Sequence, residues 1–201
     1  TGIVPPSCMI EGQSYTSLVS PLGRLGYDEA AAKKYYEEAT GGEPCEITVL
    51  CTAQYEMAVR RIIQNWQQLF GIKLFAKVEV LEEDELNLRV ENGDYQCALA
   101  QISTQAHSPV EFLKSFGNGG GIFRYNSKGF NDLLSKLSMA SGTESMVQGC
   151  GKVQEYLIQN GVFCPLFYRS SYVATSKKAV NVAVSHSGSI INFSETELLK
   201  N

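Results

Sequence analysis

Two short stretches decide the fold: EITVLC at residues 46–51 and IKLFAKVEV at residues 72–80, with a helical pattern between them. The first is a β-branched run and the second alternates partly at a period of two, so both are predicted strands. Thr52 is the expected N-cap of the intervening helix, and Gly71 ends it. A strand, a helix and a strand in this order predict parallel pairing through a right-handed crossover. The apolar face of the helix consists of residues at helical spacing: Val59, Ile62, Ile63, Trp66, Leu69 and Phe70.

The alternation of helix and strand continues along the chain. A buried strand is predicted at residues 95–102, and the short helix that follows has Ser108 as N-cap, Pro109 in its first turn and Glu111 as the capping-box partner. Together these elements predict an α/β fold in which a central, mixed but largely parallel sheet is flanked by helices. The remaining predicted elements are helices near residues 30–39, 82–91, 130–139 and 143–160, and strands at residues 162–168 and 172–175.

Composition places the chain among ordinary globular proteins. Of its 201 residues 44% are hydrophobic and 19% are charged, and the formal net charge is −4. Lysines and arginines are spread along the chain, which argues against the basic stripe that nucleic acid requires. No apolar run approaches the roughly 20 residues that span a bilayer, and the first residues lack the pattern of a signal peptide. We therefore expect a mature protein or a piece of one, with a neutral or small ligand.

Residues that could carry catalysis or bind a metal are few. His107 and His186 are the only histidines, and neither falls in a Cys/His metal spacing or at a recognisable nucleophile turn. Residues 117–121 are rich in glycine but lack a phosphate-binding pattern, so they are predicted to form a mobile loop. We expect no catalytic residue, no metal and no cofactor.

The six cysteines contain no CxxC pair, and a chain of this length does not need disulfides for stability. Most of them are expected to be buried small hydrophobic residues, as the apolar neighbours of Cys97 and Cys150 indicate. Cys45 and Cys51 are the pair most favoured for a disulfide.

Short motifs along nearly the whole chain follow a definite order. They are Val4-Pro5-Pro6, Tyr27-Asp28 followed by Ala31 and Lys33, Phe70-Gly71-Ile72-Lys73-Leu74, Gly93-Asp94-Tyr95 through Ala98-Leu99, Pro109 with Phe112-Leu113, Tyr125-Asn126-Ser127 with Phe130-Asn131, and Pro165-Leu166-Phe167-Tyr168. In this order and spacing they resemble the second, C-terminal lobe of the oligopeptide/dipeptide-binding family, bacterial solute-binding protein family 5.

The resemblance implies a periplasmic-binding-protein-like lobe that spans residues 1–201. It also implies that about residues 176–201 form a tail that returns to a first lobe of the same protein. The apolar residues of that tail are then expected to lack their natural partner surface, and we expect them to pack adventitiously or to form an intermolecular contact. They are Ile190, Ile191, Phe193, Leu198 and Leu199.

The function implied by the resemblance is that of the extracytoplasmic substrate-binding component of an ABC importer, and not of an enzyme. Two lobes close around a peptide or a related small solute, and the closed form docks on the membrane permease. The partners are therefore the ligand, the missing first lobe and the permease. The implied location is the periplasm or the cell surface as a lipoprotein, with the signal sequence encoded upstream.

One motif departs from the family pattern. Before the helix that begins at Pro109, the family commonly has Gly-Trp-x-x-Asp-Tyr-x-Asp-Pro, whose first Asp pairs with the free ammonium of a peptide. Gln105 stands here at the position of that Asp, and Ile102 at the position of the Trp. A neutral amide offers no charge, whereas a charge-assisted hydrogen bond contributes roughly 1.5–3 kcal/mol. The ligand is expected to be non-peptide, N-blocked, or recognised chiefly by the first lobe.

The residues expected to line the ligand cleft are Ser103, Gln105, His107, Tyr168 and Arg169. The first three follow the end of a predicted strand, where α/β proteins usually bind their ligands. A stand-alone interaction or ligand-sensing module built on the same lobe is the alternative function. An enzyme, for instance a cysteine hydrolase, ranks third.

Overall fold

The chain divides into two compact units, which are described one at a time. The computed structural model describes residues 2–19, 27–102, 107–117, 123–169, 174–184 and 191–199. The sheet unit contains residues 27–102, 114–117 and 123–127, and the helical unit contains the other described residues. Within these ranges no helix combines the length and the apolar character needed to cross a membrane.

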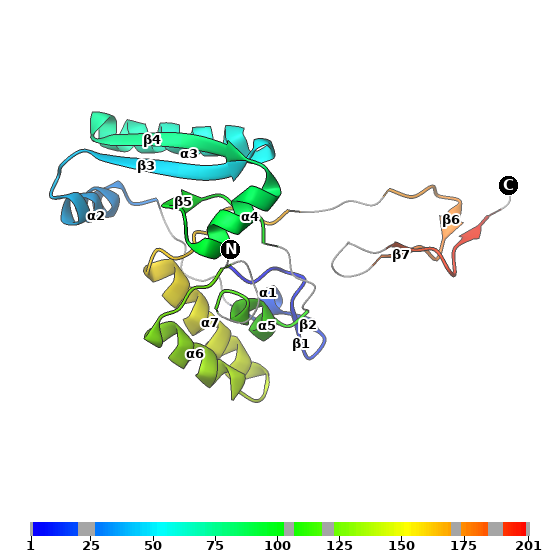
Figure 1. The fold of residues 1–201 in the computed structure, drawn as a ribbon. Helices are drawn as coiled ribbons and strands as arrows, with labels where there is room; N and C mark the ends of the chain where they lie inside the picture. The colour runs from blue at the N-terminus through cyan, green and yellow to red at the C-terminus, as the bar shows by residue number, and fades with distance from the viewer. Residues whose placement is uncertain are drawn as a thin grey trace. The chain divides into compact units, whose positions relative to one another are not determined.

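Three parallel strands form the centre of the sheet unit. The strands β3 (Cys45–Thr52), β4 (Leu74–Leu81) and β5 (Cys97–Ala98) lie in the order β4-β3-β5 (Figure 1). The β3–β4 ladder runs one to one from its first pair, Cys45 with Leu74, to its last, Thr52 with Leu81. The predicted strand-helix-strand unit and the α/β fold class are confirmed.

Helices cover both faces of this sheet because successive β3 residues point to opposite sides. The helix α3 (Glu56–Phe70) packs Val59 and Ile63 against Val49 and Cys51 on one face. On the other face, Leu50 packs against α4 (Glu83–Asn92). The helix α2 (Glu29–Thr40) contacts α3 through the stacked rings of Tyr36 and Phe70, and the Asp28 carboxylate caps it.

Two predicted strands are shorter than expected or do not form. Of the strand predicted at residues 95–102, only β5 pairs with β3, because the Gln96 side chain takes the place of a ladder partner and accepts a hydrogen bond from Thr48 N at 2.8 Å. Residues 163–169 are irregular. The N–H groups of Val162 and Phe163 both donate to Leu157 O, so the start of this segment closes the preceding helix instead of joining a sheet. Of the strand predicted at residues 172–175, only residues 174 and 175 are described, and they are irregular.

The helical unit is built on the pair α6 (Lys128–Ser138) and α7 (Thr143–Gln159), both predicted from the sequence. Glycine allows the two helices to approach closely, since a Cβ added at Gly149 would lie 2.7 Å from Leu137 Cδ1. The unit also contains the beginning of α5 (Pro109–Lys114), the short helix α1 (Tyr15–Leu18), and a hairpin of β1 (Met9–Ile10) and β2 (Gln13–Ser14).

A buried glutamine joins the N-terminal segment to α7. The Gln154 side chain is fully buried, and its Oε1 accepts hydrogen bonds from Ile3 N at 2.8 Å and Val4 N at 3.0 Å. Its amide nitrogen donates to Tyr15 Oη at 2.8 Å and to Cys150 O at 3.3 Å. Both acceptor sites and both donors of the amide are therefore used.

The last described residues form two short antiparallel pairs. The strand β6 (Ala179–Val180) pairs with β9 (Glu197–Leu198), and β7 (Ala183–Val184) pairs with β8 (Ile191–Asn192). Four of the apolar tail residues that were predicted to lack a partner surface are exposed: Ile191, Phe193 at 62%, Leu198 at 76%, and Leu199. Ile190 lies outside the described residues.

The predicted disulfide between Cys45 and Cys51 is wrong. Both residues lie in β3 and neither is bridged. Six residue-to-residue steps of extended strand separate them by about 20 Å, whereas a disulfide needs Cα atoms within about 7 Å of each other. Of the two cysteines whose apolar neighbours predicted burial, Cys150 is buried and Cys97 is half-buried. Cys8 and Cys51 are also buried, Cys45 is half-buried, and Cys164 is exposed.

Replacement of Gln154 by Ala should destabilise the chain strongly. It leaves two backbone N–H groups and the Tyr15 hydroxyl buried without their partner, and each such group costs roughly 1–3 kcal/mol. We expect urea unfolding to show a loss of about 3 kcal/mol or more. The control is Gln159→Ala on the same helix, where the side chain is exposed and should cost less than about 0.5 kcal/mol. Equal effects of the two substitutions would contradict this role.

Stability should also fall in alkaline solution. Burial raises the pKa of Cys8 to about 11 and that of Cys150 to about 12, from an ordinary thiol value of 9.0. Above that value the unfolded chain loses thiol protons that the folded chain retains, so the free energy of unfolding decreases as the pH rises. Urea unfolding at a series of pH values should show this decline, and Cys150→Ser and Cys8→Ser should each reduce its slope. Alkylation of the folded chain should modify Cys164 before either buried thiol.

Candidate functional site

The carboxyl ends of the parallel strands lie at one end of the sheet, which we call the carboxyl edge. The strand β3 ends there at Thr52, β5 ends at Ala98, and the chain continues from these ends to Tyr55 and Gln101. The Tyr55 hydroxyl donates to Gln101 Oε1 at 3.0 Å, so the two segments are joined by a hydrogen bond between side chains. Open α/β sheets bind ligands outside the carboxyl ends of their strands. Residues 103–106, which follow Gln101, include two of the predicted site residues.

Thr52 has a hydroxyl group that is buried and lacks a partner within the described residues. The sequence predicted it as the N-cap of α3, and this is wrong. A 3₁₀ turn (Ala53–Tyr55) separates Thr52 from the helix, and the Thr52 side chain makes no capping bond. A buried hydroxyl without a hydrogen bond lowers the stability of the folded state by roughly 1–3 kcal/mol. The Thr52 hydroxyl at the carboxyl ends of the strands therefore requires an explanation.

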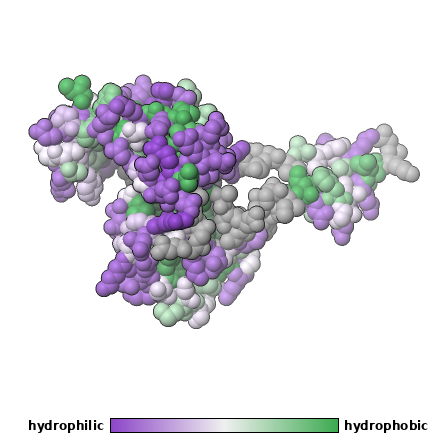
Figure 2. Space-filling view, in the orientation of Figure 1, coloured by the Kyte–Doolittle hydropathy of each residue, from purple (hydrophilic) through white to green (hydrophobic). Residues whose placement is uncertain are grey.

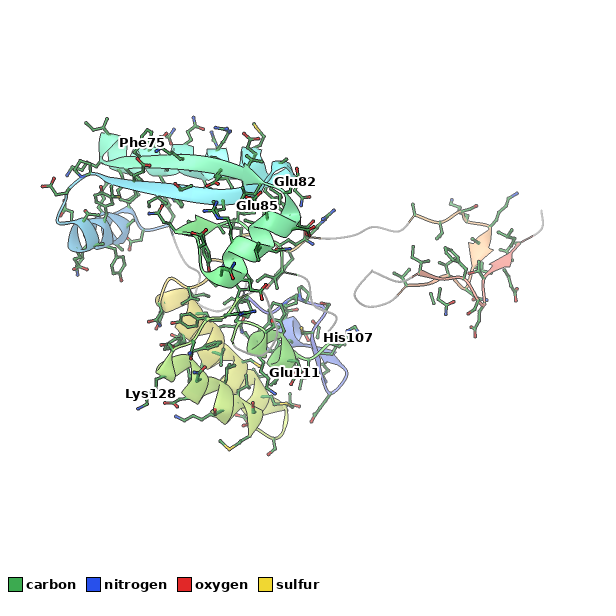
Figure 3. The ribbon with its side chains drawn as sticks, viewed as in Figure 1. Phe75, Glu82, Glu85, His107, Glu111 and Lys128 are labelled. Carbon is green, nitrogen blue, oxygen red and sulfur yellow. The ribbon has the colours of Figure 1, made fainter. Side chains whose placement is uncertain are left out.

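Charged groups near this edge have partners or favourable positions of their own. The Glu56 carboxylate pairs with Arg60 at 2.6 Å one turn further along α3. After β4, Glu82 and Glu85 lie at the start of α4, where the helix dipole favours negative charge (Figure 3). The hydrogen-bonding side chains at the ends of β3 and β5 are neutral.

His107 belongs to the helical unit and lies just before α5, with Glu111 one turn along that helix (Figure 3). Its side chain is exposed, and its backbone carbonyl accepts a hydrogen bond from Met9 N at 2.6 Å. The residue therefore helps to hold the N-terminal hairpin while its imidazole faces solvent.

Tyr168 also belongs to the helical unit and holds the same N-terminal segment. Its hydroxyl forms a hydrogen bond with Val4 O at 2.9 Å and lies within hydrogen-bonding distance of Gly2 O. Burial raises the pKa of Tyr168, so the hydroxyl stays protonated and remains a donor. Arg169 follows it and is exposed. Of the five predicted site residues, His107 and Tyr168 both form hydrogen bonds with the backbone of the N-terminal segment, at Met9 and Val4. Ser103 and Gln105 lie outside the described residues.

Two of the hollows that the described residues form lie in the sheet unit, and neither of these two is lined by a predicted site residue. The larger, of about 450 Å³, lies where α3 gives way to β4 and is lined by Gln67, Gly71, Ile72, Leu74 and Phe75. The second, of about 340 Å³, is lined by Tyr27, Glu29, Lys33, Asn65, Gln68 and Leu69. The first lies at the amino end of the strands, opposite the edge that carries Thr52.

The described residues were also compared with what a metal site or a cysteine nucleophile requires. No group of three or more His, Cys, Asp or Glu side chains in the described ranges is placed to hold a metal ion. Burial raises the pKa of Cys8, Cys51 and Cys150, which favours the unreactive thiol over the thiolate.

Sequence reasoning missed Thr52, Tyr55 and Gln101 as candidate site residues. A signal was present, because two parallel strands were predicted to end at Cys51 and Ile102 and polar residues adjoin both ends. Thr52 was instead interpreted as a helix cap, and Tyr55 as part of the helix.

The fold is similar to that of solved peptide-binding proteins, although no protein-family model and no curated protein matches the sequence. The pheromone receptor PrgZ superposes on 99% of this chain with a TM-score of 0.72 and 16% identity. Peptide-bound OppA of Listeria monocytogenes covers 95% of it (TM-score 0.67, 18% identity). DppA of Helicobacter pylori, an ABC transporter-associated periplasmic binding protein in complex with the peptide STSA, covers 87% (TM-score 0.65, 23% identity).

In turn, the chain spans 39%, 37% and 35% of the lengths of these three proteins. The resemblance that the ordered motifs predicted is therefore confirmed at the level of the fold. The chain has the periplasmic-binding-protein-like α/β fold of a part of these peptide-binding proteins.

Proposed function

We propose that the chain is one lobe of the substrate-binding component of an ABC importer for peptides or related small solutes. The observation that carries the proposal is the extent of the common fold, which reaches 99% of the chain in PrgZ. Because the chain corresponds to less than half of each compared protein, a first lobe is required to complete the ligand site. Residues 1–201 then act as a single lobe, and closure of the two lobes traps the ligand.

The carboxyl edge of the sheet is the part of this lobe that would contact the ligand. Thr52 offers a hydroxyl that lacks a partner in the described structure, and the Tyr55–Gln101 pair lies beside it in the same unit. A peptide main chain presents carbonyl and amide groups, which neutral donors and acceptors of this kind can bind. Ser103 and Gln105 follow Gln101 and extend the same polar run.

For the helical unit taken by itself, we propose that His107, Tyr168 and Arg169 contact the ligand. The Tyr168 hydroxyl already donates to a backbone carbonyl, so only the ring of this residue would contact the ligand. Its hydrogen bond would also fix the position of the neighbouring Arg169. His107 and Arg169 have exposed side chains that a ligand could reach.

The proposal assigns binding and transport, not catalysis. The closed protein would deliver its ligand to a membrane permease from an extracytoplasmic location. The tail at about residues 176–201 would return to the first lobe, and the exposure of Phe193 and Leu198 is what a missing partner surface would leave. A stand-alone module built on the same lobe remains the competing function.

Calorimetry with peptide mixtures tests the proposal. The chain alone and a two-lobe protein that contains it should be titrated side by side, and the two-lobe protein should bind at least tenfold more tightly because it closes both walls of the site. In that protein, Gln101→Ala combined with Gln105→Ala should weaken binding about tenfold, as loss of one or two hydrogen bonds does. Gln159→Ala is the matched control. Equally tight binding by the chain alone would favour the stand-alone module.

Thr52→Val should separate stability from binding. It removes the buried hydroxyl and keeps the shape of the side chain, so the free energy of unfolding should stay constant or rise by up to about 1 kcal/mol while affinity falls. Thr40→Val is the control, because Thr40 Oγ1 donates to Tyr36 O at 2.7 Å and accepts from Gly42 N at 3.1 Å. The control should lose about 1 kcal/mol of stability and keep its affinity. Unchanged affinity of Thr52→Val would remove this hydroxyl from the site.

A further inference from the structure

Among the described strands, β4 lies at the edge of its sheet. It has eight residues, and within the described part of the chain it pairs only with β3. Its second side presents backbone N–H and C=O groups that no described segment satisfies. Such an edge is a template for pairing with another strand.

Of the usual protections of an edge strand, β4 has charged side chains, Lys77 and Glu79, but neither of the other two common ones. The strand contains no proline, and its ladder with β3 has no bulge. Phe75 is 54% exposed near its start (Figure 3), Val80 is 41% exposed, and Ile72 just before the strand is 99% exposed. Figure 2 shows hydrophobic surface at the end of the layer where α3 gives way to β4. The edge therefore combines unpaired backbone with exposed apolar side chains.

The charges on β4 determine which strand fits this edge. Lys77 and Glu79 lie on the same face of the sheet, and their side chains are 52% and 43% exposed. From this pattern we infer that β4 pairs with β4 of a second copy of this chain, antiparallel and centred on Val78. Lys77 then lies opposite Glu79 of the second copy, and the two-fold axis repeats the pair. Phe75 lies opposite Leu81 on that face, and Ala76 opposite Val80 on the other.

Neighbouring registers lack this complementarity. With a two-fold axis normal to the sheet, two residues that lie opposite each other across the interface have side chains on the same face. Moving the axis by one residue along β4 therefore shifts the partner of every residue by two positions. Centring on Lys77 places two lysines opposite each other, and centring on Glu79 places two glutamates opposite each other. Like charges directly opposite destabilise a strand pair, whereas opposite charges stabilise it. The charges thus select one register, while backbone hydrogen bonds and apolar contact supply the attraction.

Existing ion pairs are compatible with this arrangement. Lys77 pairs with Glu46 of β3, and Glu79 pairs with Arg89 of α4 at 2.7 Å. The new pairs would join these into one network of charges across the interface. The strand β5 and the Tyr55–Gln101 pair lie at the other side of β3, so dimerisation through β4 leaves the proposed ligand edge accessible.

Charge reversal tests the inference through the oligomeric state. Sedimentation equilibrium of the chain, over micromolar to sub-millimolar concentrations, should show a monomer–dimer equilibrium. Lys77→Glu alone and Glu79→Lys alone each create two like-charge pairs, so each should weaken dimerisation by roughly tenfold to a hundredfold. Mixing the two variants restores opposite charges at both positions, so the mixture should form a heterodimer about as tightly as the original chain. Lys34→Glu on α2 is the control and should leave dimerisation unchanged.

Restoration by mixing distinguishes an interface effect from misfolding, because a misfolded variant cannot be rescued by a second one. A chain that stays monomeric throughout the series would overturn the inference. A dimer that neither reversal weakens, or single variants whose mixture shows no heterodimer, would overturn it equally.

Discussion

The parallel pairing of β3 with β4 is the constraint on which the rest of this structure depends. Two parallel strands cannot be joined by a tight turn, so the chain must cross over the sheet, and α3 is that crossover. The pairing places the carboxyl ends of the strands together, which creates the edge where Thr52, Tyr55 and Gln101 lie. It also leaves one side of β4 without a neighbour among the described strands. The proposed ligand site at the carboxyl ends of the strands and the proposed dimer interface along β4 thus both follow from the pairing of β3 with β4.

Two buried polar side chains illustrate opposite uses of burial. Gln154 uses all four hydrogen-bonding positions of its amide, and it fixes the N-terminal segment against α7. Thr52 is buried at its hydroxyl without any partner in the described structure. The first arrangement is typical of a group retained for structure. The second is typical of a group whose partner arrives with a ligand, which is why the proposed site is placed there.

Much of the fold could be predicted from the sequence, because its strongest signals are local. The β-branched run before Thr52 and the apolar stripe of α3 each act over a few residues, and both predictions are confirmed. The cap predicted at Thr52 is wrong. Long-range pairing was less accessible. Residues 163–169 have strand-like composition, yet their first N–H groups close α7 and Tyr168 bonds to the N-terminal segment. No local pattern could reveal the partner of Tyr168, because Val4 lies 164 positions away.

The candidate site was harder to predict for a related reason. Sequence order suggested a cleft at residues 103–107, since they follow a strand, but the polar residues that the structure places at the strand ends come from two separate segments. Tyr55 and Gln101 are 46 positions apart in the chain. Only the parallel register brings them within hydrogen-bonding distance.

The amide of Gln154 has a consequence for how the polypeptide acquires its form during synthesis. Its partner Ile3 lies 151 positions away, and the whole of residues 27–102 intervenes. Contacts of such high sequence separation carry a large loop-closure cost and form late. During synthesis, Ile3 and Val4 would therefore wait for α7 to be made, while the strand-helix-strand segment is already long enough to assemble. The segment around Ile3 is therefore expected to be among the last parts of residues 1–201 to reach its final packing.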